Sequence, residues 1–268
     1  MVDCIDKKMI FFDIDGTLIT DDGTRTFPES AKEAIRLARK NGHLTFINTG
    51  RVFVNIEEFI KDAGFDGYVC GCGTYINMGG KVLLHNKLTH EKCLEIAYKC
   101  REYDMMAIFE HTNHTAYDRE IKGDANKELL DYFKTMNRKL IDNIEDSEFV
   151  FDKFAAWYNE GSPKLESFKQ YISNEFECIQ REGNFLEVVP KGFSKATGIK
   201  FLMEHHKISI DKVLVFGDSN NDLEMIQYVP NSIVMGNCTP EVLAVASYQT
   251  DKVEDDGIYN ALKHFGVI

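Results

Sequence analysis

The sequence predicts an α/β protein: a parallel β-sheet with helices on both faces, into which a segment of mixed α and β structure is inserted. Two stretches, one at each end of the chain, alternate short apolar runs of strand length with segments of helical spacing. Such alternation is typical of parallel strands joined by crossover helices. The stretch between them has a different pattern, and 268 residues suit a core with a smaller second domain.

The N-terminal alternation begins with residues 9–13, an apolar run that ends abruptly in acids and glycine. Residues 28–41 carry apolar side chains at helical spacing, and Gly42 just beyond them suits a helix C-terminus. Further elements are expected at residues 44–48 (strand), 54–63 (helix) and 68–70 (strand). These five elements supply the first half of the predicted core.

The same pattern returns near the C-terminus. Residues 194–205 have helical spacing, and residues 212–216 form an apolar run that leads into glycine and aspartate. The remaining elements are expected at residues 222–228 (helix), 232–235 (strand), 240–246 (helix) and 257–264 (helix). We therefore assign residues 1–82 and 183–268 to the core.

Residues 83–182 are assigned to the inserted α+β segment. Strands are expected at residues 107–110, 115–117, 154–158 and 177–180, and helices at residues 89–103, 126–136 and 163–174. The polar tract 137–147 is expected to be a loop or poorly ordered. This segment is the predicted second domain.

Composition narrows the possible partners and the location. The formal net charge of −12 disfavours binding to nucleic acid or to an anionic membrane surface. No apolar stretch approaches the roughly 20 residues that span a bilayer, and the charged N-terminus is no signal peptide. Seven scattered cysteines, an odd number, indicate free thiols in a reducing compartment. We expect a cytoplasmic protein, a monomer or weak homo-oligomer, with a small-molecule substrate.

Polar clusters follow three of the predicted strands. Asp13 and Asp15 come directly after the first strand, and Gly16 lets backbone approach a ligand there. The second cluster is Thr49-Gly50-Arg51, which offers a hydroxyl and backbone N–H groups suited to an anion. The third, at residues 217–222, supplies Asp218, Asn221 and Asp222. Ligands of open α/β sheets bind outside the carboxyl ends of the strands, and oxygen-only clusters suit Mg²⁺.

One lysine lies where a bound anion would explain it. Lys195 is at the start of the predicted helix 194–205. The helix dipole favours anions at this end, so a lysine there gains nothing from the dipole itself. A negatively charged ligand would account for its position.

Taken together, four motifs resemble the haloacid dehalogenase superfamily of phosphatases. They are DxDGTL at residues 13–18, TGR at 49–51, PKGFSK at 190–195 and GDSNND at 217–222. The chain is more closely similar to the Cof-type subfamily, whose α+β cap of the C2B type follows the third strand. The resemblance covers nearly the whole chain. It implies a Rossmann-like core and a cap domain that sets substrate specificity.

The activity implied by the resemblance is Mg²⁺-dependent hydrolysis of small phosphorylated metabolites, such as sugar, nucleotide or cofactor-precursor phosphomonoesters. Asp13 would be the nucleophile that forms an aspartyl-phosphate. Asp15 would protonate the leaving alcohol and then activate water. Thr49 and Lys195 would hold the phosphoryl oxygens. Mg²⁺ and the lysine would offset the charge of a carboxylate attacking a phosphate.

The resemblance also implies the remaining binding residues. The metal ligands would be Asp13, the backbone carbonyl of Asp15, Asp218 and, in the metal shell, Asp222. Asn221 would contact phosphate, as would Gly16, Gly50 and Arg51 of the loops already described. Asp222 could instead orient Lys195, and Arg51 could equally form a salt bridge to the cap or to a core acid. The family commonly has asparagine where this chain has Cys72, so ligand contacts from that loop are not carried over.

Two other functions stay open at this level. A phosphomutase keeps the same aspartate pair but returns the phosphoryl group to another hydroxyl. A non-catalytic protein that binds a phosphorylated metabolite has little need of nucleophile, acid, lysine and metal ligands together.

Three further residues carry weaker signals. His111 and His114 are expected in an exposed polar turn between two strands rather than in a metal site, since no further ligand is evident nearby. Glu187 alternates with apolar neighbours and could face the crevice.

Overall fold

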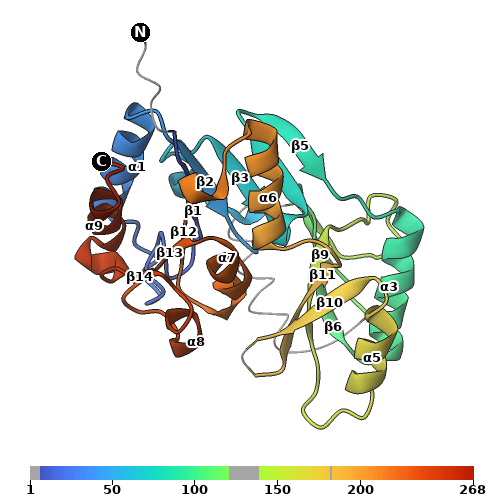
Figure 1. The fold of residues 1–268 in the computed structure, drawn as a ribbon. Helices are drawn as coiled ribbons and strands as arrows, with labels where there is room; N and C mark the ends of the chain where they lie inside the picture. The colour runs from blue at the N-terminus through green and yellow to red at the C-terminus, as the bar shows by residue number, and fades with distance from the viewer. Residues whose placement is uncertain (1–6, 121–138, 182) are drawn as a thin grey trace. The chain divides into compact units, whose positions relative to one another are not determined.

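The computed structural model describes residues 7–120, 139–181 and 183–268 (Figure 1). Its contacts divide the chain into two units. The first comprises Met1–Arg51, Ile56–Leu84 and Ser194–Ile268, and the second comprises Val52–Asn55 and His85–Phe193. The predicted fold class, α/β with an additional α+β segment, is confirmed.

The first unit is built on an eight-stranded sheet in the order β14-β13-β12-β1-β2-β3-β4-β5. The strands are β1 (Met9–Phe12), β2 (Leu44–Asn48), β3 (Gly67–Cys70), β4 (Tyr75–Met78), β5 (Lys81–His85), β12 (Val213–Gly217), β13 (Asn231–Val234) and β14 (Tyr248–Gln249). From β14 to β3 each strand pairs parallel with the next, and β4 pairs antiparallel with β3. The central strand β1 therefore has parallel neighbours on both sides, as the alternating pattern predicts.

Helices cover both faces of this sheet (Figure 1). They are α1 (Glu29–Lys40), α2 (Glu58–Lys61), α6 (Lys195–His206), α7 (Leu223–Tyr228), α8 (Pro240–Leu243) and α9 (Gly257–His264). Apolar residues of α6 and α7 pack on Met9 and Phe11 of β1. Because side chains of a strand alternate between its faces, Ile10 and Phe12 point to the opposite side. All four side chains are fully buried, so the middle of the sheet is held on both faces.

Two parts of the first half of the chain differ from the prediction. The helix expected at residues 54–63 is instead a 3₁₀ turn at Phe53–Asn55 and the short α2, because the Val54 N–H donates to the carbonyl of Thr112 rather than joining a helix. The strands β4 and β5 were not predicted. They follow glycine-rich segments, which obscure the alternation of a strand.

The second unit contains a six-stranded sheet in the order β10-β11-β9-β6-β7-β8. The strands are β6 (Met106–Glu110), β7 (Thr115–Tyr117), β8 (Leu140–Ile141), β9 (Lys153–Trp157), β10 (Phe176–Gln180) and β11 (Phe185–Pro190). They pair antiparallel except for β7 with β8. Apolar residues of α3 (His90–Glu102) and α5 (Leu165–Ile172) form one core with the sheet.

Most expected elements of this unit are present within one or two residues. The strand β8 lies inside the tract predicted as a loop, and β11 was not predicted. The helix expected at residues 126–136 lies outside the described residues. No described helix of either unit has both the length and the apolar character that a membrane span requires.

Candidate active site

Asp13 and Asp15 occupy the loop that follows β1. The Asp13 N–H donates to the Phe216 carbonyl at 3.0 Å, so Asp13 continues the pairing of β1 with β12 before the chain turns. The turn needs Gly16, which has a φ of +72°. A Cβ added there would lie 2.3 Å from Asp218 Oδ2. The glycine thus brings the first and third predicted clusters into contact.

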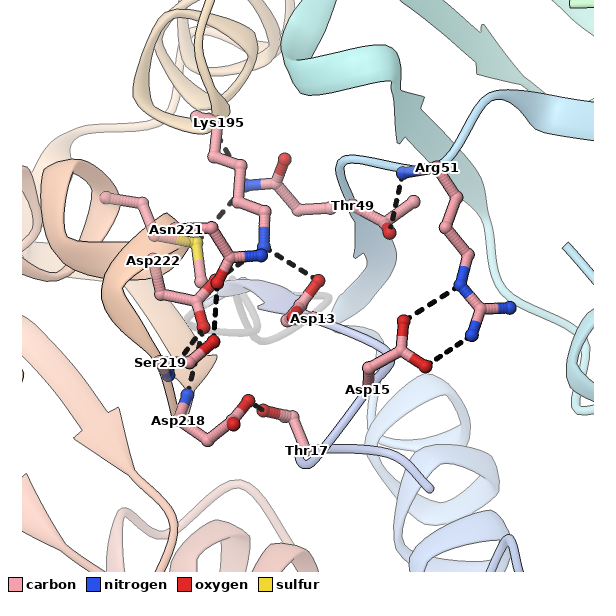
Figure 2. Close-up of polar contacts among 12 residues, drawn as sticks. Asp13, Asp15, Thr17, Thr49, Arg51, Lys195, Asp218, Ser219, Asn221 and Asp222 are labelled. Carbon is pink, nitrogen blue, oxygen red and sulfur yellow. Dashed lines mark hydrogen bonds and ion pairs between the residues drawn. The ribbon is translucent and has the colours of Figure 1, made fainter. Parts of the chain in front are cut away.

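Lys195 reaches into the same place from α6 (Figure 2). It is the first residue of this helix, whose N-terminus is capped reciprocally by Ser194 and Thr197. Its Nζ lies 2.7 Å from Asp13 Oδ1 and 2.5 Å from Asp222 Oδ1. The side chain is 2% exposed, so this ammonium is held almost entirely by carboxylates.

Asp218 and Asp222 come from the loop after β12. Asp222 is engaged through both oxygens, because Oδ2 accepts the N–H groups of Asp218 (2.9 Å) and Ser219 (3.3 Å) while Oδ1 contacts Lys195. Asp218 Oδ1 accepts the hydroxyl of Thr17 at 2.9 Å. Asp222 therefore orients Lys195 and stabilises the loop to which it belongs.

The cluster of Asp13, Asp218, Asp222 and Lys195 has more negative than positive charge. Burial raises the pKa of Asp13 to about 7, although Lys195 opposes the shift. Burial also raises the pKa of Asp218 to about 8, and the carboxylates of Asp222 and Asp13 add to the effect. Burial lowers the pKa of Lys195, but Asp13 and Asp222 raise it more strongly, so the ammonium stays charged. A further positive charge would relieve the repulsion among these acids.

The donor atoms of this cluster suit a hard divalent cation. Asp13, Asp218 and Asp222 each offer a carboxylate oxygen within 4.8 Å of the others. Mg²⁺ prefers oxygen ligands and commonly takes one or two carboxylates together with water and phosphate. The residues present therefore fit the magnesium ion that the resemblance implies.

Asp15 lies apart from this cluster, in an ion pair with Arg51 (Figure 2). Arg51 contacts both carboxylate oxygens, with Nε donating to Oδ2 at 2.8 Å. The same guanidinium donates to Glu57 through Nη1 at 2.6 Å, and Arg25 also contacts both Glu57 and Asp15, at 2.6 and 3.5 Å. Of the two roles left open for Arg51, the structure shows the salt bridge to a core acid.

The other predicted phosphate-binding residues surround the acids. Thr49 is buried and its Oγ1 accepts the N–H of Arg51 at 3.1 Å, which shapes the loop that contains Gly50. Asn221 Oδ1 accepts the hydroxyl of Ser219 at 2.6 Å. All of the predicted site residues belong to the first unit.

Three residues of this region were not predicted from the sequence. Thr17 lies within the first motif, so its hydroxyl could have been noticed as a partner for an acid. Arg25 and Glu57 have no local signal, because the ion pair between them joins positions 32 residues apart in the chain.

Cys72, where the family commonly has asparagine, has a backbone conformation that would also suit asparagine. It has a φ of +54°, a left-handed conformation that asparagine adopts more readily than most other side chains. Its N–H donates to the Thr49 carbonyl at 3.1 Å, and the Gly71 N–H donates to the Arg51 carbonyl at 2.8 Å. The backbone of this turn therefore supports the second predicted cluster whichever side chain is present.

Two expectations about the second unit need correction or completion. The turn at His111–His114 exists, but His114 is buried and its Nε2 lies 3.0 Å from the Val150 carbonyl, so the prediction of an exposed turn is wrong for this residue. Glu187 is buried in an ion pair with Lys153 of the same unit, at 2.7 Å.

The chain is similar to known proteins over nearly its whole length. The family described as haloacid dehalogenase-like hydrolase matches residues 10–262. The YkrA protein of Bacillus subtilis (strain 168) is 27% identical over 269 residues, which cover 98% of this chain and 100% of YkrA. The YcsE protein of the same organism, a 5-amino-6-(5-phospho-D-ribitylamino)uracil phosphatase, is 25% identical over 263 residues, covering 97% of this chain and 96% of YcsE.

A solved structure agrees with both sequence matches. BT4131, a sugar phosphatase of haloacid dehalogenase subclass IIB, superimposes with a TM-score of 0.81 at 27% identity, covering 97% of this chain and 100% of BT4131. The predicted resemblance and the predicted enzyme class, a phosphatase of this type, are confirmed by these matches. The chain belongs to the haloacid dehalogenase-like hydrolase family.

Proposed function

We propose that this enzyme is a Mg²⁺-dependent phosphatase that hydrolyses small phosphorylated metabolites through an aspartyl-phosphate on Asp13. The observation that carries the proposal is the position of Lys195, buried and in contact with both Asp13 and Asp222. A lysine in this place can neutralise a phosphoryl group that arrives at Asp13.

In the first step a carboxylate oxygen of Asp13 attacks phosphorus, the bond from phosphorus to the ester oxygen breaks, and the alcohol leaves with a proton from Asp15. In the second step water, deprotonated by Asp15, attacks the phosphorus of the aspartyl-phosphate. Phosphate leaves and the Asp13 carboxylate is restored. The nucleophile of the first step is thus a side chain of the enzyme, and that of the second step is a water molecule activated by Asp15.

Asp15 must exchange partners for this sequence to occur. Both of its carboxylate oxygens now accept hydrogen bonds from Arg51, whereas the first step requires the side chain to donate a proton to the leaving oxygen. The side chain is 43% exposed, which leaves it accessible to a proton and to an arriving substrate. We propose that an incoming phosphate ester draws Arg51 toward its own oxygens and releases Asp15 to act as the acid.

Mg²⁺ would be held by Asp13, by the backbone carbonyl of Asp15 and by Asp218. Asp222 would support this set through Lys195 rather than contribute a ligand, because both of its oxygens are already engaged. When bound, the ion would neutralise charge on the transferring phosphoryl group. Gly16, Thr49, Gly50 and Asn221 would contribute backbone N–H or side-chain contacts to the phosphate oxygens.

The substrate we propose is a phosphomonoester of a sugar or of a related polyol. BT4131 is a sugar phosphatase and the YcsE substrate is a phosphoribityl compound, so in both the phosphate sits on a polyhydroxy carbon chain. The second unit is the proposed specificity cap. We also propose a cytoplasmic location, since the described cysteines are all free thiols.

The test is phosphate release from a panel of sugar, polyol, nucleotide and cofactor-precursor phosphates, with Mg²⁺ and with EDTA. We expect metal-dependent release, and a loss of about 10⁴-fold or more in Asp13→Asn. Asp21→Asn, which changes an exposed aspartate of the same loop, should retain full activity. No release from any ester that the protein still binds would reject hydrolysis in favour of a mutase or a binding protein, and release by Asp13→Asn would reject the nucleophile.

A further inference from the structure

A second group of possible metal ligands lies in the second unit. His85 is the last residue of β5 and belongs to this unit, His111 opens the turn between β6 and β7, and Asp152 immediately precedes β9. Each of the three offers one ligand atom, and these atoms all lie within 4.8 Å of one another. Three segments that are distant in the sequence therefore converge on one point.

The sequence could not indicate this group. A turn with two histidines offers too few ligands by itself, and His85 and Asp152 are 26 or more positions away from it along the chain in either direction. Pairing of β6 with β9 brings Asp152 beside this turn, where its N–H donates to the Glu110 carbonyl at 2.8 Å. The missing ligands are thus supplied by the fold.

We propose that His85, His111 and Asp152 bind one Zn²⁺ ion or a chemically similar divalent transition-metal ion. Two imidazoles and one carboxylate, with a fourth position for water, are a common tetrahedral ligand set for zinc. Ligand atoms about 2.1 Å from such an ion are roughly 3.4 Å apart. The His85–Asp152 pair must therefore open from 2.7 Å, and the wider separations, at most 4.8 Å, must close by no more than about 1.4 Å. The set differs from that of Asp13, Asp218 and Asp222, which contains oxygen alone.

The ligands are already held in place. His85 Nε2 lies 2.7 Å from Asp152 Oδ1, where a cation can replace the proton that the two groups share. The other carboxylate oxygen, Oδ2, accepts the Thr112 N–H at 2.8 Å, and the Asp152 side chain is 1% exposed. Such supporting hydrogen bonds orient the ligands of established metal sites.

His111 can serve as the third ligand with the loss of few existing interactions. Its ring centroid lies 4.5 Å from that of His114, with the two rings tilted by 31°, and His114 is itself held by the Val150 carbonyl. Asn113 N–H donates to His111 Nδ1 at 3.2 Å, in an exposed position. A metal bound through either ring nitrogen displaces at most this one long hydrogen bond. A His85–Asp152 pair alone would not require His111 to lie beside it.

The test uses the full chain with Mg²⁺ in excess, so that the oxygen-only cluster is occupied. Titration with Co²⁺ should give one equivalent with the intense visible absorption of a tetrahedral nitrogen-containing site, and Zn²⁺ should displace it. His111→Asn and Asp152→Asn should each weaken binding by at least about 10-fold. Asp152→Asn keeps an acceptor for Thr112 and a donor for His85, so it removes charge while preserving the hydrogen bonds.

Two controls separate this site from others. His205→Asn removes an exposed histidine of α6, and Asp218→Asn impairs the oxygen-only cluster; both should keep the tetrahedral spectrum. A spectrum that is absent from the unmutated protein, or that survives in His111→Asn, would overturn the proposal.

A measurement on the unmutated protein covers the case in which the variants do not fold. Zn²⁺ should protect His111 from modification by diethyl pyrocarbonate, as read by mass spectrometry of the peptide. Equal modification of His111 with and without Zn²⁺ would likewise overturn the proposal. Failure of this site would leave the proposed phosphatase activity untouched, since that activity rests on the first unit.

Discussion

Each unit of the molecule buries a lysine among carboxylates, but the two clusters differ in their balance of charge. In the first unit Lys195 contacts Asp13 and Asp222. A carboxylate oxygen of Asp218 lies within 4.8 Å of an oxygen of each of these acids. Three acids there share one ammonium. The cluster is short of positive charge.

In the second unit Lys153 contacts Glu110 at 3.0 Å and Glu187 at 2.7 Å. Arg181 also contacts Glu187, so among the residues that the structure describes two acids face two cations. Burial alone would raise the pKa of Glu187, but Lys153 and Arg181 lower it well below its ordinary range. This cluster is balanced.

The contrast shows how a ligand site can be distinguished from a structural ion pair. Burying charges is costly, and a balanced cluster recovers that cost within the protein. In an unbalanced cluster, part of this free-energy cost can be offset only by a bound ligand. In the first unit that ligand would be a metal ion together with a phosphate ester. The raised pKa values of Asp13 and Asp218 and the lowered pKa of Glu187 are the physical signs of this difference.

The largest effect is expected from removal of the lysine in the unbalanced cluster. Lys195→Met should lower kcat/KM for phosphate release by about 10³-fold or more, because the charge on the transferring phosphoryl group then has no ammonium beside it. Steady-state kinetics at saturating Mg²⁺ measures this. Lys200→Met, an exposed position on the same helix, is the control. A loss below about 10-fold would mean that Lys195 only holds Asp222.

Neutralising one acid in each cluster should have unequal consequences for stability. Glu187→Gln should lower the free energy of unfolding by about 3 kcal/mol or more, because Lys153 and Arg181 lose a buried counter-charge. Asp218→Asn, measured without metal, should change it by no more than about 1 kcal/mol, because the substitution removes repulsion and keeps an acceptor for Thr17. Urea denaturation in EDTA compares the two. Equal losses would contradict the difference in charge balance.

Acid should weaken the balanced cluster specifically. Because the folded pKa of Glu187 lies below its unfolded value, near 4.5, its stabilising contribution is complete above pH 4.5 and is lost as pH falls toward the folded pKa. Each pH unit in that window costs at most about 1.4 kcal/mol from this group. Urea denaturation between pH 3 and pH 6 gives the free energy of unfolding at each pH. This free energy should fall less steeply with decreasing pH in Glu187→Gln than in the unmutated protein. Parallel slopes would show that Glu187 does not cause the acid sensitivity.

The sequence could predict the cluster around Lys195 but not the cluster around Lys153. Asp13, Thr49 and Asp218 each follow a strand of a parallel sheet, and the carboxyl ends of such strands meet at one edge. The order of strands and motifs along the chain was therefore enough to bring them together. Two elements of the same unit, β2 and α9, were also predicted with the bounds that the structure shows.

The second unit has no comparable rule. Lys153 and Glu187 meet because β9 pairs antiparallel with β11, and neither that pairing nor β11 itself was evident from local patterns. Its six-stranded order depends on which distant strands pack together, which one sequence does not specify. For the same reason His85, His111 and Asp152 could not be joined in advance. The same limit applied in the first unit to Arg25 and Glu57.

The smallest effect concerns Arg51, where the salt bridge that the structure shows and a contact with substrate predict different kinetics. Arg51→Lys keeps the positive charge but loses the two-pronged bond to Asp15. Because the proposed mechanism moves Arg51 onto the substrate phosphate, KM should rise by about 3- to 10-fold while kcat changes little. A fall in kcat at constant KM would instead show that Arg51 acts only by orienting Asp15. Arg36→Lys, in an exposed ion pair on α1, gives the background effect of the same substitution at a site that touches none of the catalytic acids.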